Sequence, residues 1–560
     1  MPRWLSPRLY LAWGGAILIA CYFLSFTWRG LDSYFSRDDL MNVQSLHGYW
    51  EIPLWRLCAD TFLVWLPSYR PFGGVVYRFL FLGAGMNPVP FHVFCFLLLF
   101  TNIALVYQVA RILTDSAEMA FLAALIFCYH PALFDLYYDS ATLYDLLCGA
   151  FYFTIICVYV KWRRSNGSFS WIQVLILLTL LLLALQSKEM ALTLPVILTA
   201  YEIFYPRRSL NRCLILMYIL TAAVLTSKLL TKNALSANPL YHPQFSLDLV
   251  GHAYAHYYRL LFPALPLSAA LALVIAGLIW RAKLLWFGLL FFVVALVPVV
   301  VVPPRAGFVM YIPMLGLALA AAFLMVAARD AAVSYLRISS KLQPQFCVAM
   351  AAALLVVYSN YRTDALRPLL TDQENLRAAA SDLPRLRGTL RPGANVLLVN
   401  DPMSPESWEC TWLFRLLYAD PRIWVDRRRD LANADAAELS LYDHAFENRS
   451  GQYVEVALPP PASLAPVKVI FTPSRVRQGE AYAVSMEEFP DSAVDVAFWL
   501  VKDSPISGGV VRNWCSLDKN GSARLIAPAD APAGTIVLKK VRPAGAVWRP
   551  AEGSLEVVRR

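Results

Sequence analysis

The first 360 residues alternate between long apolar runs and short polar connections. Runs near the roughly 20 residues that cross a membrane as a helix occupy the ranges 9–28, 91–110, 118–134, 143–162, 170–187, 190–205, 212–229, 265–280, 284–303, 307–328 and 345–360. In lipid, a helix satisfies its own backbone hydrogen bonds. The pattern therefore predicts a polytopic α-helical membrane protein with about eleven spans.

Basic residues in the short connections predict the orientation of these helices. Lys and Arg cluster on one side of the predicted topology, which is then cytoplasmic, at positions 3–8, 111, 161–164, 207–212, 281–283 and 329–341. The other side receives a first loop at about 29–90 and everything after Tyr361. We expect an integral protein of the bacterial inner membrane with its C-terminal part in the periplasm or outside, or of the endoplasmic reticulum membrane in a eukaryote. If the interfacial helix predicted at 246–262 spans instead, the C-terminal part moves to the cytoplasm.

The pattern changes after Tyr361. A polar helix at 371–390, a buried strand at 396–399 and a helix at 408–418 predict a small extracytoplasmic α/β domain over 361–457. A proline-rich linker follows at 458–462. Short alternating strands over 466–560 then predict an immunoglobulin-like β-sandwich. The transmembrane domain would occupy 1–360.

Composition agrees with a membrane protein. Hydrophobic residues make up 58% and charged residues 16% of the chain, against about 25% charged in soluble domains. The net charge of +10 follows from the basic connections, so it does not indicate a nucleic-acid partner. The ten cysteines show no metal-binding spacing. Two alternatives remain open for Cys410 and Cys515: they form a disulfide, or both are free thiols.

An acidic pair, Asp38-Asp39, follows the first apolar run directly after Arg37. Carboxylates beside lipid are costly unless they are used or paired. An acceptor hydroxyl needs a general base to become a nucleophile, and either carboxylate is suited to that role. An exposed loop dyad without a function is the alternative.

Basic residues on the same predicted side suit an anionic head group. Arg70, Arg78 and Arg305 carry the fork that binds phosphate well, and Lys188 stands with Glu189 between two apolar runs. Salt bridges with the aspartates, or mutual neutralisation of Lys188 and Glu189 with snorkelling, would explain the same residues.

Two further groups of polar residues lie on this side. Asp135, Asp139 and Asp145 follow His130-Pro131. Asp248, His252 and His256 share one face of the helix predicted at 246–262. An interfacial face explains the second group, and metal binding is the alternative. The sequence predicts no cofactor, and a role for a divalent metal stays open.

This succession of motifs resembles the polytopic, lipid-dependent glycosyltransferases of the GT-C class. The resemblance covers about residues 10–325. It is closest to the transmembrane and tetratricopeptide-repeat O-mannosyltransferases, with the protein O-mannosyltransferases more distant. It rests on these pieces in this order: Asp38-Asp39, Ser68-Tyr69-Arg70-Pro71 with Arg78, Asn87-Pro88 with Phe91-His92, His130-Pro131 with Asp135, Asp145-Leu146-Leu147, Ser187-Lys188-Glu189-Met190 with Pro195, and Tyr311-Ile312-Pro313 near Arg305.

The resemblance implies a GT-C-like fold and an inverting transfer from a polyprenyl- or dolichyl-phosphate sugar to a protein, lipid or glycan acceptor. It implies a carboxylate base in the first external loop, and the order of the pair in the more distant relatives favours Asp38. The chain departs from the family in two places. Thr142-Leu143-Tyr144-Asp145 stands where the family often has Gly-Arg-Ala-Asp, and the repeat domain is replaced.

The predicted site therefore has three groups of residues. The catalytic carboxylates are Asp38 and Asp39. The cations for the donor phosphate are Arg70, Arg78, Lys188 and Arg305. The residues that support the site or contact acceptor and sugar are Tyr69, Asp135, Asp145, Glu189 and His256. A transporter or flippase of lipid-linked saccharides, and a non-catalytic assembly protein with a degenerate core, are the competing functions. A phosphoryl transferase is disfavoured because the tail has a single histidine, His444.

Overall fold

A computed structural model gives the structure of the 560-residue chain. It describes residues 17, 21, 24, 27–46, 50, 52–63, 70–166, 169–205, 211–230, 243–262, 275, 282–337, 343–360, 367–403, 408–431, 436–460, 465–489, 493–500, 511–527, 534–543 and 549–558. The chain forms two compact units, Met1–Asn42 with Leu54–Leu370, and Val43–Pro53 with Thr371–Arg560. The expected first loop is thus divided between the two units.

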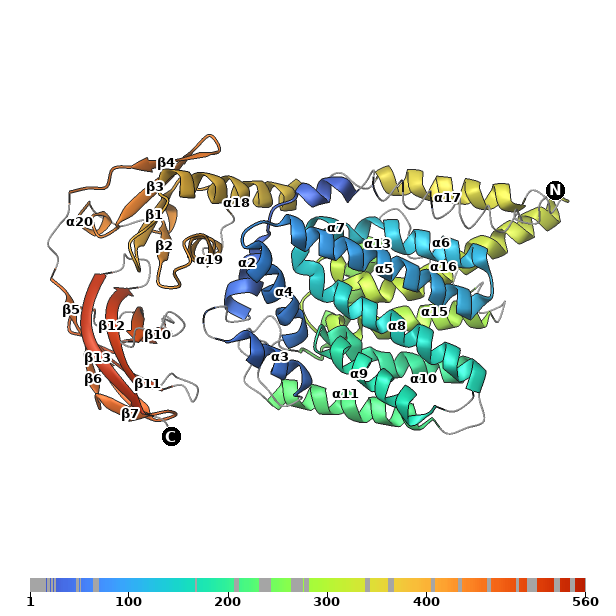
Figure 1. Ribbon diagram of the computed structural model, residues 1–560, viewed down its shortest axis with the longest axis horizontal. Helices are drawn as coiled ribbons and strands as arrows, with labels where there is room; N and C mark the ends of the chain where they lie inside the picture. The colour runs from blue at the N-terminus through green and yellow to red at the C-terminus, as the bar shows by residue number, and fades with distance from the viewer. Residues whose placement is uncertain are drawn as a thin grey trace. The chain divides into compact units, whose positions relative to one another are not determined.

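The first unit is helical. Figure 1 shows its long helices side by side, with α2, α3 and α4 at one end of the bundle. The longer helices are α4 Pro71–Ala84, α5 Val89–Thr114, α6 Ala117–Tyr129, α8 Leu143–Asn166, α9 Trp171–Leu185, α10 Leu194–Phe204, α11 Arg212–Leu230, α13 Leu247–Leu261, α15 Lys283–Val300, α16 Tyr311–Tyr335 and α17 Gln343–Asn360. Shorter helical turns connect them: η1 Trp28–Asp32, α2 Arg37–Met41, α3 Leu54–Phe62, η3 Pro131–Leu133, α7 Asp135–Tyr138, η4 Ser140–Thr142, η5 Glu189–Thr193 and η7 Gly307–Met310. The short helix η2 Asn42–Leu46 crosses the boundary, since its residues from Val43 on group with the second unit.

Five helices of the described chain are long and apolar enough to cross a membrane, and a bent pair raises the number to six. The five lie at Val89–Thr114, Ser140–Ser165, Arg212–Leu229, Lys283–Val300 and Gly307–Tyr335. The bent pair joins α6 to the turns after Pro131 at an angle of 55°, since proline ends the helix before it. The predicted count of eleven is not confirmed.

The remaining predicted spans have different outcomes. The ranges 9–28 and 265–280 lie almost wholly outside the described residues. The ranges 170–187 and 345–360 form apolar helices shorter than those five. The range 190–205 divides into η5 and α10. The helices α9 and α17 and the two parts η5 and α10 stay candidates for membrane spans. A short or interrupted helix crosses lipid only with help from its neighbours.

Glycines bring α15 and α16 close together. A Cβ placed on Gly288 would lie 2.6 Å from the carbonyl oxygen of Gly316, and a Cβ on Gly316 would lie 2.5 Å from that of Gly288. Both distances are far below van der Waals contact. Small residues at such a crossing let helices pack without help from the hydrophobic effect, as is usual in lipid.

The second unit begins with a small α/β sheet. Its strands β1 Asn395–Val399, β2 Trp424–Arg427, β3 His444–Arg449 and β4 Gln452–Val456 lie in the order β2-β1-β3-β4. The first three are parallel, and β4 pairs antiparallel with β3. Helices α18 Arg367–Leu386, α19 Trp408–Leu417 and α20 Ala436–Leu439 connect or flank them. The helix, strand and helix predicted at 371–390, 396–399 and 408–418 therefore exist, with α18 shifted by four residues.

Among the described residues, nine strands follow in two further sheets. The first has the order β10-β9-β12-β13-β5 with β7 added to β13, and the second has the order β11-β8-β6. The strands are β5 Val467–Lys468, β6 Ile470–Thr472, β7 Arg475–Arg477, β8 Ala481–Ser485, β9 Ala493–Leu500, β10 Val511–Ser516, β11 Ser522–Ile526, β12 Gly534–Pro543 and β13 Arg549–Val558. Both sheets contribute to one core, through residues such as Val484 and Leu555. The immunoglobulin-like topology stays a prediction.

The disulfide considered between Cys410 and Cys515 is wrong. Cys410 is a buried free thiol. Its Sγ lies 3.1 Å from the sulfur of Met403, inside the α/β part of the second unit. Packing, rather than a covalent cross-link, explains its position.

Candidate active site

The short helix α2 separates the two carboxylates of the acidic pair. Ser36 is the N-cap, and its backbone amide donates to Asp39 Oδ2 at 2.8 Å while the Asp39 amide donates back to Ser36 Oγ at 3.4 Å. This reciprocal capping box fixes Asp39 at the third helical position. Asp39 is fully buried, whereas Asp38 is exposed.

Asp39 receives further hydrogen bonds from two distant elements. Ser140 Oγ donates to Asp39 Oδ1 at 2.8 Å, and the hydroxyl of Tyr77 on α4 donates to the same oxygen. The hydroxyl of Tyr77 also lies 2.7 Å from the carbonyl oxygen of Ser140. Burial raises the pKa of Asp39 to about 6, although the hydrogen bonds from Tyr77, Ser36 and Ser140 oppose that rise.

A third carboxylate lies beside the pair. Asp139 caps η4 by accepting from the amide of Ala141 at 2.9 Å. Burial, followed by the charges of Asp39 and Asp38, raises the pKa of Asp139 well above its usual range. The structure thus brings three carboxylates together at the start of the bundle, of which the sequence indicated two as a pair and the third only as part of a run.

Arg70 is held in an unusual conformation at the start of α4. Its φ of 46° and ψ of 55° lie in the left-handed region, which costs a residue with a Cβ about 1–2 kcal/mol. Its Nη2 and Nε donate to Glu189 Oε2 at 2.7 and 3.1 Å. This two-point contact offsets the strain and fixes the guanidinium.

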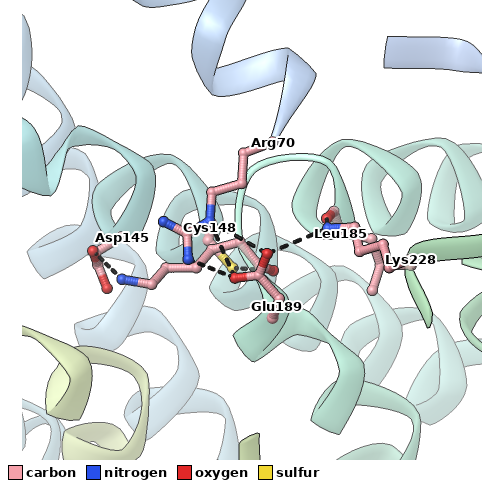
Figure 2. A network of polar contacts seen from close by, with 7 residues as sticks. Arg70, Asp145, Cys148, Leu185, Glu189 and Lys228 are labelled. Atoms are coloured by element: carbon pink, nitrogen blue, oxygen red, sulfur yellow. Dashed lines mark hydrogen bonds and ion pairs between the residues drawn. The ribbon is translucent and has the colours of Figure 1, made fainter. Parts of the chain in front are cut away.

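The same carboxylate accepts from a second cation. Lys228 Nζ on α11 lies 3.5 Å from Glu189 Oε1 and 3.1 Å from the carbonyl oxygen of Leu185. Lys188 turns the other way and lies 2.5 Å from Asp145 Oδ2 on α8. Figure 2 shows Arg70, Asp145, Glu189 and Lys228 converging from different elements. We call Arg70, Asp145, Lys188, Glu189 and Lys228 the ion cluster.

The sequence left open that Lys188 and Glu189 neutralise each other, and the contacts in the ion cluster differ from that pairing. Lys188 pairs with Asp145, and Glu189 pairs with Arg70 and Lys228. Lys188 and Glu189 therefore do not neutralise each other. The turn between α9 and η5 makes this possible, because Lys188 is extended while Glu189 already begins the 3₁₀ helix.

Electrostatics within the ion cluster follow from burial and close opposite charges. Burial raises the pKa of Glu189, but Arg70 and Lys228 outweigh burial and hold that pKa well below its usual range. Burial lowers the pKa of Lys188, and Asp145 opposes the decrease. The five residues carry three formal positive and two formal negative charges, which leaves one positive charge in a largely buried place.

Two stacked tyrosines connect the carboxylates to the ion cluster. The ring of Tyr144 stacks on that of Tyr77 at 5.5 Å between centroids and 19° between planes. Arg70 Cζ lies 5.6 Å from the centre of the Tyr144 ring, within the range of a cation–π contact. A Cβ on Gly73 would lie 2.2 Å from Tyr144 Cδ1, so this glycine makes room for the ring.

The other predicted site residues lie on several elements of the helical unit. Arg78 is buried on α4, and Asp135 is half-buried on α7. His256 Nε2 lies 3.3 Å from the carbonyl oxygen of Arg305, whose amide donates to the Tyr257 hydroxyl at 3.2 Å. These contacts tie α13 to the loop before η7. The ring centre of Phe308 in η7 lies 4.7 Å from Lys188 Nζ. Tyr69 lies outside the described residues.

Sequence reasoning missed five side chains of this site: Ser36, Tyr77, Ser140, Tyr144 and Lys228. Three of them have signals in the chain. Ser36 lies three residues before Asp39, which is the spacing of a capping box. Tyr77 directly precedes Arg78, and Tyr144 directly precedes Asp145. Lys228 looks like a snorkelling lysine at the end of an apolar run. Among the residues that the structure describes, no group of three or more His, Cys, Asp or Glu side chains could hold a metal ion.

A comparison with known proteins gives one distant relative. The chain is 24% identical over 201 residues to protein O-mannosyl-transferase TMTC3 of the mouse, Mus musculus. The aligned region covers 34% of this chain and 21% of the relative. No family model matches the chain. No solved structure matches it.

This similarity supports a coarse conclusion. It relates the chain distantly to a glycosyltransferase, and the apolar helices fit a multi-pass membrane protein. Because the chain spans only about a fifth of the length of that relative, the sugar, the donor and the acceptor do not follow from it.

Proposed function

We propose that the protein is an inverting glycosyltransferase that moves a sugar from a polyprenyl- or dolichyl-phosphate carrier to an acceptor hydroxyl. The acceptor belongs to a protein, lipid or glycan, and transfer takes place on the extracytoplasmic side. The name of the mouse relative makes mannose and a protein hydroxyl the first pair to test.

One observation carries this proposal. A contact series runs from the carboxylate pair to the ion cluster through Asp39, Tyr77, Tyr144 and Arg70. A transferase of this type needs a base for the acceptor and positive charge for the departing phosphate within one site. The series supports the proposal because direct contacts connect the proposed base region to the proposed phosphate-binding residues.

The chemistry is a single displacement. The acceptor hydroxyl gives its proton to a carboxylate while its oxygen forms a bond to the anomeric carbon of the sugar. The bond from that carbon to the phosphate oxygen breaks, and its electron pair stays on the lipid phosphate. Attack from the face opposite the phosphate inverts the anomeric centre. Arg70 and Lys188 would stabilise the developing phosphate charge.

Asp38 fits the role of base better than Asp39. Asp39 accepts from Ser36, Tyr77 and Ser140, so its oxygens are already occupied. Asp38 is exposed one position earlier on the same helix, where a substrate can reach it. Asp39 would then hold α2 against α4 and η4.

The peripheral residues complete the proposed site. Arg78 and Arg305 would add positive charge around the donor phosphate, and Asp145 keeps Lys188 in place. Asp135, His256 and Tyr69 would contact sugar or acceptor, or support the loops that do. Asp135 and His256 are both half-buried, so each has a surface that a ligand can use.

Turnover by the purified protein in nanodiscs tests this function. Wild-type protein with a radiolabelled polyprenyl-phosphate mannose and an acceptor peptide should form product of inverted configuration. Asp38→Asn should lower turnover by roughly 10²–10⁴ while donor binding persists. Full activity in Asp38→Asn would refute the assignment of the base. Full activity in both Asp38→Asn and Asp39→Asn would remove this loop from catalysis, and donor translocation without product would favour a transporter.

A further inference from the structure

The aromatic ring of Phe308 lies beside the ammonium group of Lys188. The distance from the ring centre to Lys188 Nζ is 4.7 Å, which is within the range of a cation–π contact. Lys188 also pairs with Asp145 at 2.5 Å, and only 7% of its side chain is exposed. Phe308 is half-buried. The residue therefore contacts the cation and keeps a surface of its own beside the ion cluster.

The turn η7 holds this ring in place. Gly307, Val309 and Met310 are buried, so Phe308 is the residue of η7 that keeps an exposed surface. A Cβ on Gly307 would overlap the carbonyl group of Ala132, which shows how closely η7 packs on η3. The hydrogen bonds between α13 and the loop before η7 hold the same segment. Such support from surrounding structure is what a binding residue requires.

The chemistry of the proposed donor brings its sugar close to this ring. The anomeric carbon is bonded to an oxygen of the phosphate, so a residue beside the phosphate also lies close to the sugar. Lys188 is one of the cations that we assign to that phosphate, and Phe308 is its direct neighbour. A sugar ring presents C–H bonds on its faces, and these pack on the negatively polarised face of an aromatic ring.

Two other roles of the ring would explain the same geometry. The ring would serve only to shield Lys188, or it would contact the lipid chain of the donor. Both alternatives concern parts of the donor that a sugar-free lipid phosphate also has. A comparison of ligands with and without the sugar therefore separates them from sugar binding.

We propose that Phe308 is a sugar-binding residue of the donor site, on which one face of the donor hexose packs while Lys188 contacts the adjoining phosphate. The inference rests on the proposed function and deepens it, because it assigns a place to the sugar. Phenylalanine has no hydrogen-bonding group, so the contact recognises an apolar face of the sugar ring rather than a single hydroxyl group.

Binding of two probes to the full-length protein in nanodiscs tests the inference. Farnesyl phosphate carries the lipid and the phosphate, and mannosyl farnesyl phosphate adds the sugar. The readout is the ratio of their two dissociation constants. Phe308→Leu should weaken the mannosylated probe relative to farnesyl phosphate by roughly three- to ten-fold, the range typical of one aromatic contact. Phe308→Tyr keeps the ring and should keep the wild-type ratio.

Two further variants complete the comparison. Phe308→Met removes the ring but keeps most of its volume, so it should give the same change in ratio as Phe308→Leu even if the smaller residue impairs folding. Phe62→Leu is the matched control, since Phe62 is an exposed phenylalanine at the end of α3, and it should leave both affinities unchanged.

The inference and the proposed function fail in different ways. Equal weakening of both probes in Phe308→Leu and Phe308→Met, or no weakening of either, gives the ring no contact with the sugar and overturns the inference. If Lys188→Met and Arg70→Met still weaken both probes, the proposed donor site stands without Phe308. If neither Lys188→Met nor Arg70→Met weakens either probe, the proposed donor site itself is overturned.

Discussion

Asp39 accepts from three hydroxyl groups and one backbone amide, so its ionised form is the one that fits its surroundings. Its pKa of about 6 lies above the usual value because of burial. Asp39 is half ionised at that pKa, approaches full ionisation at higher pH and loses its charge as pH falls further. We expect the turnover rate to fall below pH 6, by about ten-fold for each further pH unit.

A change of Tyr77 should move that pH dependence in a known direction. The hydrogen bond from Tyr77 lowers the pKa of Asp39, so Tyr77→Phe should move the acidic limb of the rate profile to higher pH. Turnover measured from pH 4.5 to 8 checks the shift. A limb that stays in place would show that another group controls the acidic side.

Lys188 should stabilise the transition state of the proposed transfer. Lys188→Met should cost roughly 2–4 kcal/mol of transition-state stabilisation, as is typical for the loss of one charge-stabilising group. Because Asp145 would then be a buried carboxylate without its partner, the variant Lys188→Met with Asp145→Asn serves as the control for folding. Single-turnover rates separate the two effects. Normal transfer in Lys188→Met with loss in Arg70→Met would give the phosphate role to the arginine.

At the scale of elements, α4 depends on a glycine for its fit to α8. A Cβ on Gly73 would meet two atoms of the buried Tyr144 ring at 2.2 and 2.3 Å. Gly73→Ala should therefore displace Tyr144, lower stability by about 1–3 kcal/mol and reduce turnover at least ten-fold. Thermal unfolding and initial rates measure both effects.

The same helix offers a matched control. A Cβ on Gly83 meets nothing within 4 Å, so Gly83→Ala should keep activity and stabilise α4 by up to about 1 kcal/mol. Equal loss of activity in both variants would show that α4 responds to any added side chain rather than to displacement of Tyr144.

Sequence patterns predicted elements better than their contacts. Apolar runs located α5, α8, α11, α15 and α16, because length and composition suffice for a helix in lipid. The Lys188-Glu189 junction was also noted from the sequence. The capping spacing of Ser36-x-x-Asp39 was missed, although its signal is local. The pairing of Arg70 with Glu189 across 119 residues was not readable from the sequence, because it depends on how the first turn of α4 meets the turn after α9, where the amide of Phe72 donates to the carbonyl oxygen of Gln186.

At the scale of the whole chain, division into units follows contacts rather than sequence order. Residues 43–53 group with residues 371–560, although the helix α2 just before them belongs to the helical unit. This grouping was not predictable from the sequence pattern, because residues 43–53 read as part of one loop with their neighbours. The residue that we propose as the base, Asp38, thus lies five positions before a segment of the second unit.

Truncation tests which part of the second unit the site requires. Leu458 packs against the core of the α/β part, and among the described strands none of β5–β13 is paired with β1–β4. A chain that ends after Leu458 should therefore insert into membranes, bind farnesyl phosphate and keep its unfolding temperature within a few degrees. A chain that ends at residue 366 also loses all of 371–560, with which residues 43–53 group, so it should insert but turn over more slowly. Loss of insertion in the longer chain would show that the last strands stabilise the membrane part. Equal turnover by both chains would show that Asp38 is positioned by α2 and its capping box alone.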